Sequence, residues 1–145
     1  MYTIKEVAEC MKVSEHTLRF WDKSGFFPFV SRDKNNIRNF SDSDLLWVYI
    51  VKCLKSTGAD NKAIKRYIDL CIMGDSTVEE RYEIIKATKV KAEEKMKELI
   101  KQMEVLEKKE SYYETMIENK ENDKFNPMNL RYNFDEFLKS RFVKM

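Results

Sequence analysis

Three cysteines and one histidine are the side chains of this sequence with the most obvious capacity for chemistry. Cys10, Cys53 and Cys71 are an odd number at long, irregular spacings, which fits neither a disulfide framework nor a CxxC metal knuckle. Reduced thiols in a cytosolic protein are the default for such a set. His16 is the only histidine, and residues 72–145 contain neither Cys nor His. The distal half of the chain therefore lacks ligands for a metal-sensing site.

Patterns typical of catalysis are missing from the sequence. No acid/base pair, nucleophile–base set, phosphate loop or metal site is apparent, so we predict that the protein is not an enzyme and uses no cofactor. Cys53 follows Leu46 and Ile50 by seven and three residues, which places it on an apolar helix face. A small buried hydrophobe is the ordinary interpretation of such a cysteine. Cys10 and Cys71 are likewise predicted to be core residues.

The stretch from Val13 to Phe40 has the pattern of a nucleic-acid reader. Ser14 is a preferred N-cap residue, Leu18 and Trp21 form the inward face of the helix that it starts, and Gly25 ends that helix. A capping box with Thr at its first position starts an earlier helix over residues 3–11. Two short helices joined by a tight turn predict a helix-turn-helix. The basic polar loop that follows can lie on backbone phosphates, as a wing does.

Two further helices complete the predicted first domain. Ser41 caps the third, and Thr57-Gly58 ends it; because it is apolar on most sides, we expect it to be central to the core. Asp60 caps the fourth and Gly74 ends it. The inward residues of the fourth helix are predicted to be Ile64, Tyr67, Ile68, Cys71 and Ile72.

Composition favours a mainly α-helical protein, because the 145 residues include only three Gly and two Pro. The net charge is +2, but residues 1–74 carry twelve Lys/Arg against nine Asp/Glu, residues 75–123 ten against fourteen, and residues 124–145 five against two. This modest asymmetry is by itself a weak argument for a polyanionic partner. No leader or membrane-spanning run is apparent, so we expect a soluble cytoplasmic protein with no membrane partner.

A heptad pattern follows the first domain. Ser76 and Thr77 each precede a Glu by three residues and are candidate N-caps for a long helix, which Pro127 is expected to stop. The predicted seam positions are Val78, Tyr82, Ile85, Lys89, Ala92, Met96, Leu99, Met103, Leu106, Glu110, Tyr113 and Ile117. Nearly six heptads predict a dimeric coiled coil.

The charged seam residues favour an antiparallel homodimer that crosses near Leu99. In that register Lys89 of one copy meets Glu110 of the other, and Ala92 meets the larger Leu106. A parallel pair would stack like charges at both charged positions, which is costly in a seam. The sequence thus predicts a DNA-binding domain over residues 1–74, a dimerisation helix over 75–121, and a tail over 122–145 with an effector or interface role.

A set of short motifs runs through the first seventy-four residues: Tyr2-Thr3-Ile4, Thr17-Leu18-Arg19-Phe20-Trp21-Asp22, Gly25-Phe26-Phe27-Pro28, Arg38-Asn39-Phe40-Ser41, Asp44-Leu45, Thr57-Gly58 and Ile64. In this combination they resemble the MerR family of transcriptional regulators. Phe20-Trp21 replaces a common Tyr-Tyr, and Asn36-Ile37-Arg38 replaces a Gly-Tyr-Arg in the wing. The family architecture, in which an antiparallel coiled coil joins two winged-helix domains, agrees with the heptad pattern.

The resemblance implies a mechanism and a set of DNA contacts. Family members bind promoter DNA whose spacer is over-long, and distort it so that RNA polymerase engages both promoter elements. Activator and repressor roles both remain open. The implied DNA-binding residues are Ser14, His16, Thr17, Arg19, Phe20, Lys23, Arg32, Lys34 and Arg38.

Three further segments carry a narrower resemblance: Lys52-Cys53-Leu54-Lys55, Ile64-Lys65-Arg66-Tyr67 and Gly74-Asp75. They resemble the NmlR/AdhR-like branch, which implies that Cys53 senses aldehydes or other thiol-reactive electrophiles in a stress response. Nearby cations lower a thiol pKa, and Lys52 and Lys55 are the local candidates. One alternative trigger is a small apolar ligand at the junction of coil, tail and first domain. An alternative of another class is a coiled-coil module that recruits a protein without binding DNA.

Overall fold

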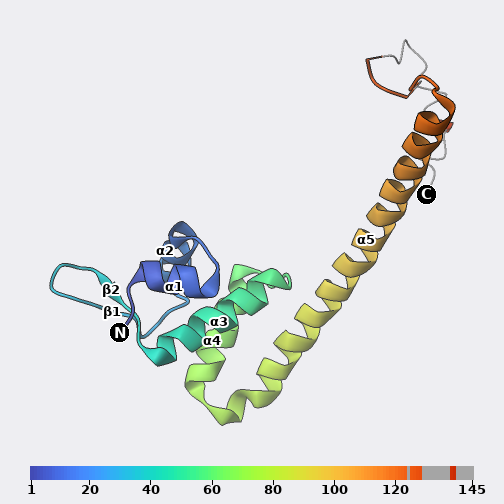
Figure 1. Ribbon diagram of the computed structural model, residues 1–145. Coiled ribbons are helices and arrows are strands. Elements are labelled where there is room, and N and C mark those ends of the chain that lie inside the picture. The colour runs from blue at the N-terminus through green and yellow to red at the C-terminus, as the bar shows by residue number, and fades with distance from the viewer. Residues whose placement is uncertain (124, 129–137, 140–145) are drawn as a thin grey trace. The chain divides into compact units, whose positions relative to one another are not determined.

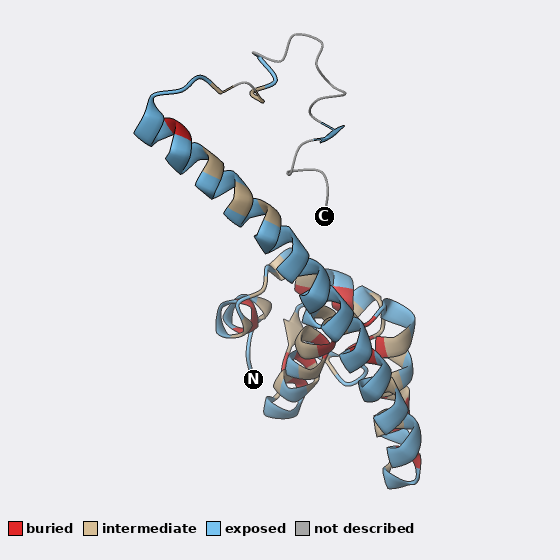
Figure 2. Cartoon of the chain, turned by 90° about the vertical axis from the view of Figure 1, so that its right-hand side faces the viewer, coloured by how far each residue is buried: buried red, intermediate tan, exposed pale blue. Residues whose placement is uncertain are grey.

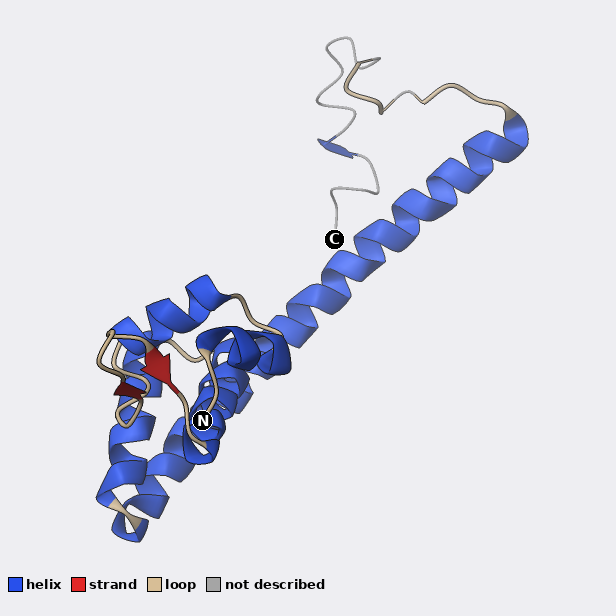
Figure 3. Cartoon of the chain, turned by 60° about the vertical axis from the view of Figure 1, so that its left-hand side comes forward, coloured by secondary structure: helices blue, strands red, loops and turns tan. Residues whose placement is uncertain are grey.

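The computed structural model describes residues 1–123, 125–128 and 138–139. It is mainly helical, with one two-stranded hairpin (Figures 1 and 3). The element order is α1 (Ile4–Met11), α2 (Glu15–Lys23), β1 (Ser31–Arg32), β2 (Arg38–Asn39), α3 (Asp42–Ser56), α4 (Asn61–Met73), the 3-10 turn η1 (Asp75–Thr77) and α5 (Val78–Asn119). The predicted winged helix-turn-helix and the long helix after it are both confirmed.

Two compact units make up the chain, Met1–Glu93 and Glu94–Met145, and the division falls inside α5. The predicted domain limit at residue 74 falls at the end of α4, before the division between the units, and stays a prediction. Most of the tail, for which an effector or interface role is predicted, lies outside the described residues, including Tyr132, Phe134, Phe137 and Phe142.

Side-chain caps start the helices where the sequence predicts them. The Thr3 amide donates to Glu6 Oε2 at 2.7 Å, and the Glu6 amide returns a bond to Thr3 Oγ1 at 3.3 Å. The bond from the Thr3 backbone holds the pKa of Glu6 below its ordinary value. Ser41 and Asp44 form a second capping box at the start of α3. Each box pairs two groups that a helix start would otherwise leave open.

The core of the first unit lies where α1 to α4 meet (Figure 2). Its largest fully buried side chains are Phe26, Phe40, Leu18, Ile64, Ile68, Leu70, Val7, Val48 and Val51. The Phe27 ring meets the Trp21 ring edge-on at a centroid distance of 6.4 Å and the Phe40 ring at 6.0 Å. Phe40 also pairs through its backbone with Tyr2. The aromatic segment after α2 thus closes the core under the hairpin.

Several burial predictions were wrong, because each helix packs on fewer sides than its apolar content suggests. Leu46 and Tyr49 on α3 are more than half exposed, so α3 is not central on every side. On α4, Ile72 is exposed and Leu70 is fully buried. Cys10, predicted in the core, is exposed on α1, because Val7 and Ala8 take the inward face of that helix.

The start of α5 departs from the predicted capping boxes. Gly74, with φ +98°, ends α4 in a conformation that L side chains rarely adopt, and η1 reverses the chain. The Thr77 hydroxyl is buried and faces the carbonyl oxygens of Leu70 and Gly74, at 2.6 and 2.7 Å. Thr77 therefore fastens the turn to α4 instead of capping the long helix.

The first turns of α5 pack within the first unit, and the seam residues Ile85, Lys89 and Ala92 line a pocket there with Cys53 and Leu54 of α3. Thr88 is buried and Arg81 is largely covered, and Thr77 is buried in η1 just before the helix. The seam side chains that are 44–79% exposed are Val78, Tyr82, Ile85, Met96, Leu99, Met103, Leu106, Tyr113 and Ile117. The described residues therefore leave most of the heptad stripe exposed.

The helix ends at Asn119, before the predicted stop at Pro127. Lys120 adopts the left-handed conformation with φ +51°, and the Tyr112 and Tyr113 hydroxyls donate to the two Asp123 carboxylate oxygens at 3.0 and 3.3 Å. The hydroxyl bonds draw the chain back onto the last turns of α5. The end of this helix therefore coincides with these side-chain hydrogen bonds and not with Pro127.

Candidate nucleic-acid interface

The second helix of the helix-turn-helix presents a polar and aromatic face. Ser14 Oγ accepts the Thr17 amide at 3.0 Å, and the two hydroxyls lie 2.8 Å apart. Leu18 and Trp21 are buried as predicted, which fixes the rotation of α2 about its axis. The candidate contacts His16, Arg19, Phe20 and Lys23 are exposed.

Arg19 is the cation on this face whose side chain makes a defined contact. Its guanidinium contacts Glu15 Oε2 one turn earlier at 2.6 Å, and the Arg19 side chain is still 52% exposed. An exposed i, i+4 pair contributes little stability, so a phosphate or base edge can replace Glu15 at small cost. Phe20 is 49% exposed beside it. Cationic and apolar groups thus lie side by side on α2.

The predicted basic loop is an antiparallel β-hairpin in which Ser31 pairs with Asn39 and Arg32 with Arg38. Asp33 organises its turn, because Asp33 Oδ1 accepts the amides of Asn35 and Ile37 at 2.8 and 2.9 Å. Asn36 takes the left-handed conformation, with φ +61°, which Asn tolerates well. The hairpin projects from the helices of its unit with Lys34 exposed in the turn (Figure 1).

Asp22 on α2 is the residue that the sequence analysis missed. Its Oδ2 atom accepts Arg38 Nε at 2.5 Å and an Arg32 guanidinium nitrogen at 3.0 Å. Arg38 was predicted to contact DNA, but its side chain is only 20% exposed and its guanidinium lies on Asp22. Arg32 is more exposed, at 39%, and also donates to the Asn36 carbonyl at 3.3 Å. The available signal was an acidic residue near the end of α2, just ahead of a basic loop.

Cys53 is half-buried in the same unit. It lines an open pocket of about 290 Å³, together with Leu54, Thr57, Ile85, Thr88, Lys89 and Ala92. A hydrogen bond with Cys53 raises the pKa of the Tyr49 hydroxyl above its ordinary value. The thiol is therefore neither sealed in the core nor fully exposed.

The cation that lines this pocket is neither Lys52 nor Lys55, the two candidates that the sequence suggested. The Lys55 ammonium bonds to the Asn61 side chain at the start of α4. Lys89 of α5 lines the pocket instead and lies 3.8 Å from Glu93. Cys53 and a residue thirty-six positions later in the sequence thus line the same pocket.

The third cysteine lies in a separate environment. An Arg81 guanidinium nitrogen is 3.9 Å from Cys71 Sγ. The pKa of the neighbouring Tyr67 hydroxyl is raised, first by its own burial and second by the Cys71 thiol beside it. Arg81 Nε is buried without a hydrogen-bond partner among the described atoms. This cluster joins the end of α4 to the start of α5.

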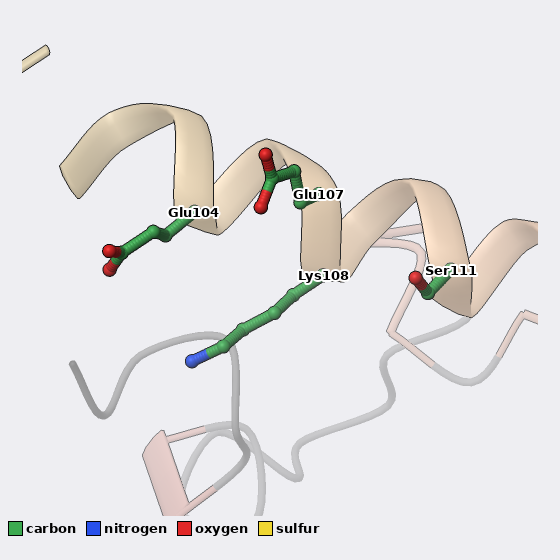
Figure 4. Close-up of a pocket in the computed structure, with 4 residues that line it drawn as sticks. All are labelled: Glu104, Glu107, Lys108 and Ser111. Atoms are coloured by element: carbon green, nitrogen blue, oxygen red, sulfur yellow. The ribbon is translucent and has the colours of Figure 1, made fainter. Parts of the chain in front are cut away.

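The second unit has a recess of about 300 Å³ on α5, lined by Glu104, Glu107, Lys108 and Ser111 (Figure 4). Its polar side chains extend from successive turns of one helix face. Within residues 1–123 and the short described segments of the tail, no three Cys, His, Asp or Glu side chains gather as a metal site would require. The same residues include no helix long and apolar enough to cross a membrane.

Comparison with known proteins gives a consistent result. The sequence pattern described as MerR HTH family regulatory protein matches residues 2–71. An uncharacterized HTH-type transcriptional regulator of Haemophilus influenzae is 39% identical over 113 residues, which cover 78% of this chain and 84% of the relative. The HTH-type transcriptional regulator AdhR of Bacillus subtilis is 33% identical over 82 residues, 57% of this chain and 59% of AdhR.

Solved structures resemble the chain over a similar length. HiNmlR, described as a MerR family regulator lacking the sensor domain and bound to promoter DNA, has a TM-score of 0.68 and 38% identity, and the match covers 79% of this chain and 91% of HiNmlR. A MerR family transcriptional regulator from Bacillus thuringiensis has a TM-score of 0.69 and 30% identity, covering 77% of this chain and 98% of that protein. These relatives are regulators, not enzymes.

Proposed function

The chain belongs to the MerR family of helix-turn-helix regulators, and we propose that it binds promoter DNA as an antiparallel homodimer and responds to thiol-reactive electrophiles or aldehydes through Cys53. The observation that carries the DNA-binding part is the exposed face of α2 beside a basic hairpin. The 38% identity to HiNmlR, whose structure is described with promoter DNA, supports the same partner.

The DNA contacts divide into two kinds. Arg19 and Phe20, from the middle of α2, enter the major groove, where Arg19 can read a guanine edge or bind a phosphate. Arg32 and Lys34 lie on backbone phosphates, which fixes register without reading sequence. Ser14, His16, Thr17 and Lys23 position the ends of the helix. Two copies then read a palindromic operator.

Promoter distortion follows from the pairing of two DNA-binding domains in one dimer. Family members act on a spacer that is too long for RNA polymerase, and paired wings that grip the backbone can bend and untwist the DNA between them. DNA bending measured by circular permutation, with and without effector, tests this step. A straight operator in both states would refute it.

The homodimer is supported by the open stripe on α5. Leu99 and Leu106 are 58% and 59% exposed, which is costly for apolar side chains in water, and a second copy of the stripe covers them. In the antiparallel register Lys89 meets Glu110 of the other copy. Lys89→Glu should weaken the dimer in sedimentation, and adding Glu110→Lys should restore it. Two single variants as dimeric as wild type would rule out the register.

The sensing chemistry is a bond from Cys53 Sγ to an electrophilic carbon. With an aldehyde, the sulfur adds to the carbonyl carbon and the thiol proton ends on the former carbonyl oxygen, which gives a hemithioacetal. The pocket that Cys53 and Lys89 both line is open, so an electrophile can reach the sulfur. An adduct there changes the packing between α3 and α5.

The open pocket also favours the alternative trigger, a small apolar ligand that forms no covalent bond. Leu54, Ile85 and Ala92 supply an apolar lining, which suits such a ligand. Treatment with an aldehyde or alkylating agent, followed by adduct mapping with mass spectrometry, separates the two. An unmodified Cys53 in the native protein, with full induction of Cys53→Ser, would refute the thiol sensor.

An electrophoretic shift with the promoter of the protein itself tests the class of function. A salt-dependent complex with that DNA is expected. Failure to bind at low salt would instead favour the protein-recruiting coiled-coil module.

A further inference from the structure

We propose that Asp22 is a positioning residue for DNA binding, which ties the hairpin to the recognition helix through Arg38. The inference rests on the proposed DNA-binding function. Asp22 lies on α2, and Arg38 is the first residue of β2, sixteen positions later. Their contact at 2.5 Å joins the element that reads the groove to the element that grips the backbone. Asp22 itself is only 14% exposed.

The two arginines on Asp22 have different roles. Arg38 is 20% exposed and makes the shorter contact, so it serves as the internal link. Arg32 is 39% exposed, with a contact of 3.0 Å. One carboxylate between two guanidinium groups leaves a net positive charge at this point. Arg32 is therefore the group that can exchange Asp22 for a phosphate, while Arg38 stays in place.

The hairpin needs such a link because it is short. Each strand has two residues, and an isolated two-stranded hairpin is at best marginally stable in water. Phe40, fully buried, and its backbone bridge to Tyr2 anchor the base at the β2 end. Asp22 is the side chain of α2 that holds the paired Arg32–Arg38 position further out.

A hairpin that is already ordered in the free protein should bind DNA with higher affinity than a mobile one. A loop that is mobile before binding loses conformational freedom when it settles on the backbone, and that loss subtracts from affinity. With Arg38 fixed on Asp22, Arg32 and Lys34 approach the phosphates already ordered. The acid thus increases affinity for a polyanion through its effect on neighbouring cations.

This role predicts a sign opposite to that of plain electrostatics. DNA binding is dominated by charge, so removing a carboxylate from the DNA-facing surface should tighten binding if the carboxylate acts only through repulsion. Loss of the link should weaken binding instead. Asp22→Asn separates the two cases, since it keeps the size of the side chain and removes its charge.

The experiment measures binding of the full chain to a fluorescent duplex of about 30 base pairs of mixed sequence. Mixed sequence suffices because phosphate contacts are independent of sequence. Salt is varied between about 50 and 200 mM, which gives the slope of log affinity against log salt. Glu9→Gln, an exposed carboxylate on α1, is the matched control for the change in charge.

Asp22→Asn is expected to weaken binding about five- to twentyfold and to reduce the salt slope by about one, as when a phosphate contact is lost. Glu9→Gln should bind as well as wild type or slightly better. Asp22→Glu keeps the charge and should recover most of the affinity. Because a loss of global folding would also weaken binding, each variant is compared by thermal unfolding.

A double-mutant cycle with Arg38→Gln identifies the route. If Asp22 acts through Arg38, the double variant binds no worse than the weaker single variant. Tryptic cleavage after Arg32 and Lys34 in the free protein gives a readout without DNA, and it should accelerate in Asp22→Asn but not in Glu9→Gln.

Unchanged or tighter binding by Asp22→Asn would overturn the inference, and so would additive effects in the cycle. Failure of wild type to bind the duplex at low salt would overturn the proposed function as well. Faster cleavage of the hairpin in Asp22→Asn would then still show the mechanical link. The two failures are therefore distinguishable.

Discussion

Apolar side chains are buried in the winged helix-turn-helix but exposed along the stripe on α5. In the first, Leu18, Phe26 and Phe40 are at most 1% exposed, and four short helices share one core. In the second, Leu99 and Leu106 are more than half exposed, although the heptad pattern is as regular as any helix pattern in the chain.

The difference follows from what each region has to pack against. Short helices that turn back on one another cover their own apolar faces, so the domain is complete in one chain. Beyond the pocket of Cys53, most seam side chains of α5 are not covered by the described residues, and in the proposed homodimer a second copy covers them. We therefore expect the first region to determine the stability of the monomer and the second to determine association.

The largest expected effect lies in the core. Phe40→Ala should reduce the free energy of unfolding by about 3–5 kcal/mol, because it removes a buried ring and leaves a cavity. Urea denaturation followed by circular dichroism measures the change. Phe29→Ala is the matched control, since that ring is 59% exposed and should cost far less. Equal losses at the two positions would contradict the division between core and surface.

A smaller effect is expected at the seam. Leu99→Ala should raise the dimer dissociation constant about ten- to a hundredfold, which corresponds to the apolar area removed from the crossing point. Sedimentation equilibrium measures it. Lys101→Ala, two residues away and off the seam, should leave association unchanged. If Leu99→Ala instead destabilised the monomer and left the dimer intact, the stripe would have an intramolecular role.

The smallest effect concerns pH and the first helix. The bond from Thr3 lowers the folded-state pKa of Glu6 below 4.5, so Glu6 stabilises the fold above that value, and this contribution is lost as pH falls through the folded-state pKa. Glu6→Gln should lower Tm at pH 7 and converge with wild type in acid, below the folded-state pKa of Glu6. A difference in Tm that persists in acid would show that the shape of the Glu6 side chain, and not its charge, stabilises the helix start.

Local features of the sequence were sufficient for much of the fold. Thr3, Ser14, Ser41 and Asp60 start helices where they were predicted to, because a cap involves only residues three apart. Gly74 ends α4 for an equally local reason. The basic hairpin and the exposed face of α2 were also predictable, since Leu18 and Trp21 fix which side is buried.

Tertiary structure alone decided how distant side chains meet. Asp22 receives two arginines from the hairpin, and Lys89, not Lys55, lines the pocket of Cys53, because chain reversals bring these groups together. The spacing of residues along the sequence does not show which distant side chains come together. The face of α5 that its own unit covers was likewise set by the turn at Gly74 and Thr77. Periodicity defines a stripe on a helix, but only packing decides which stripe is left exposed.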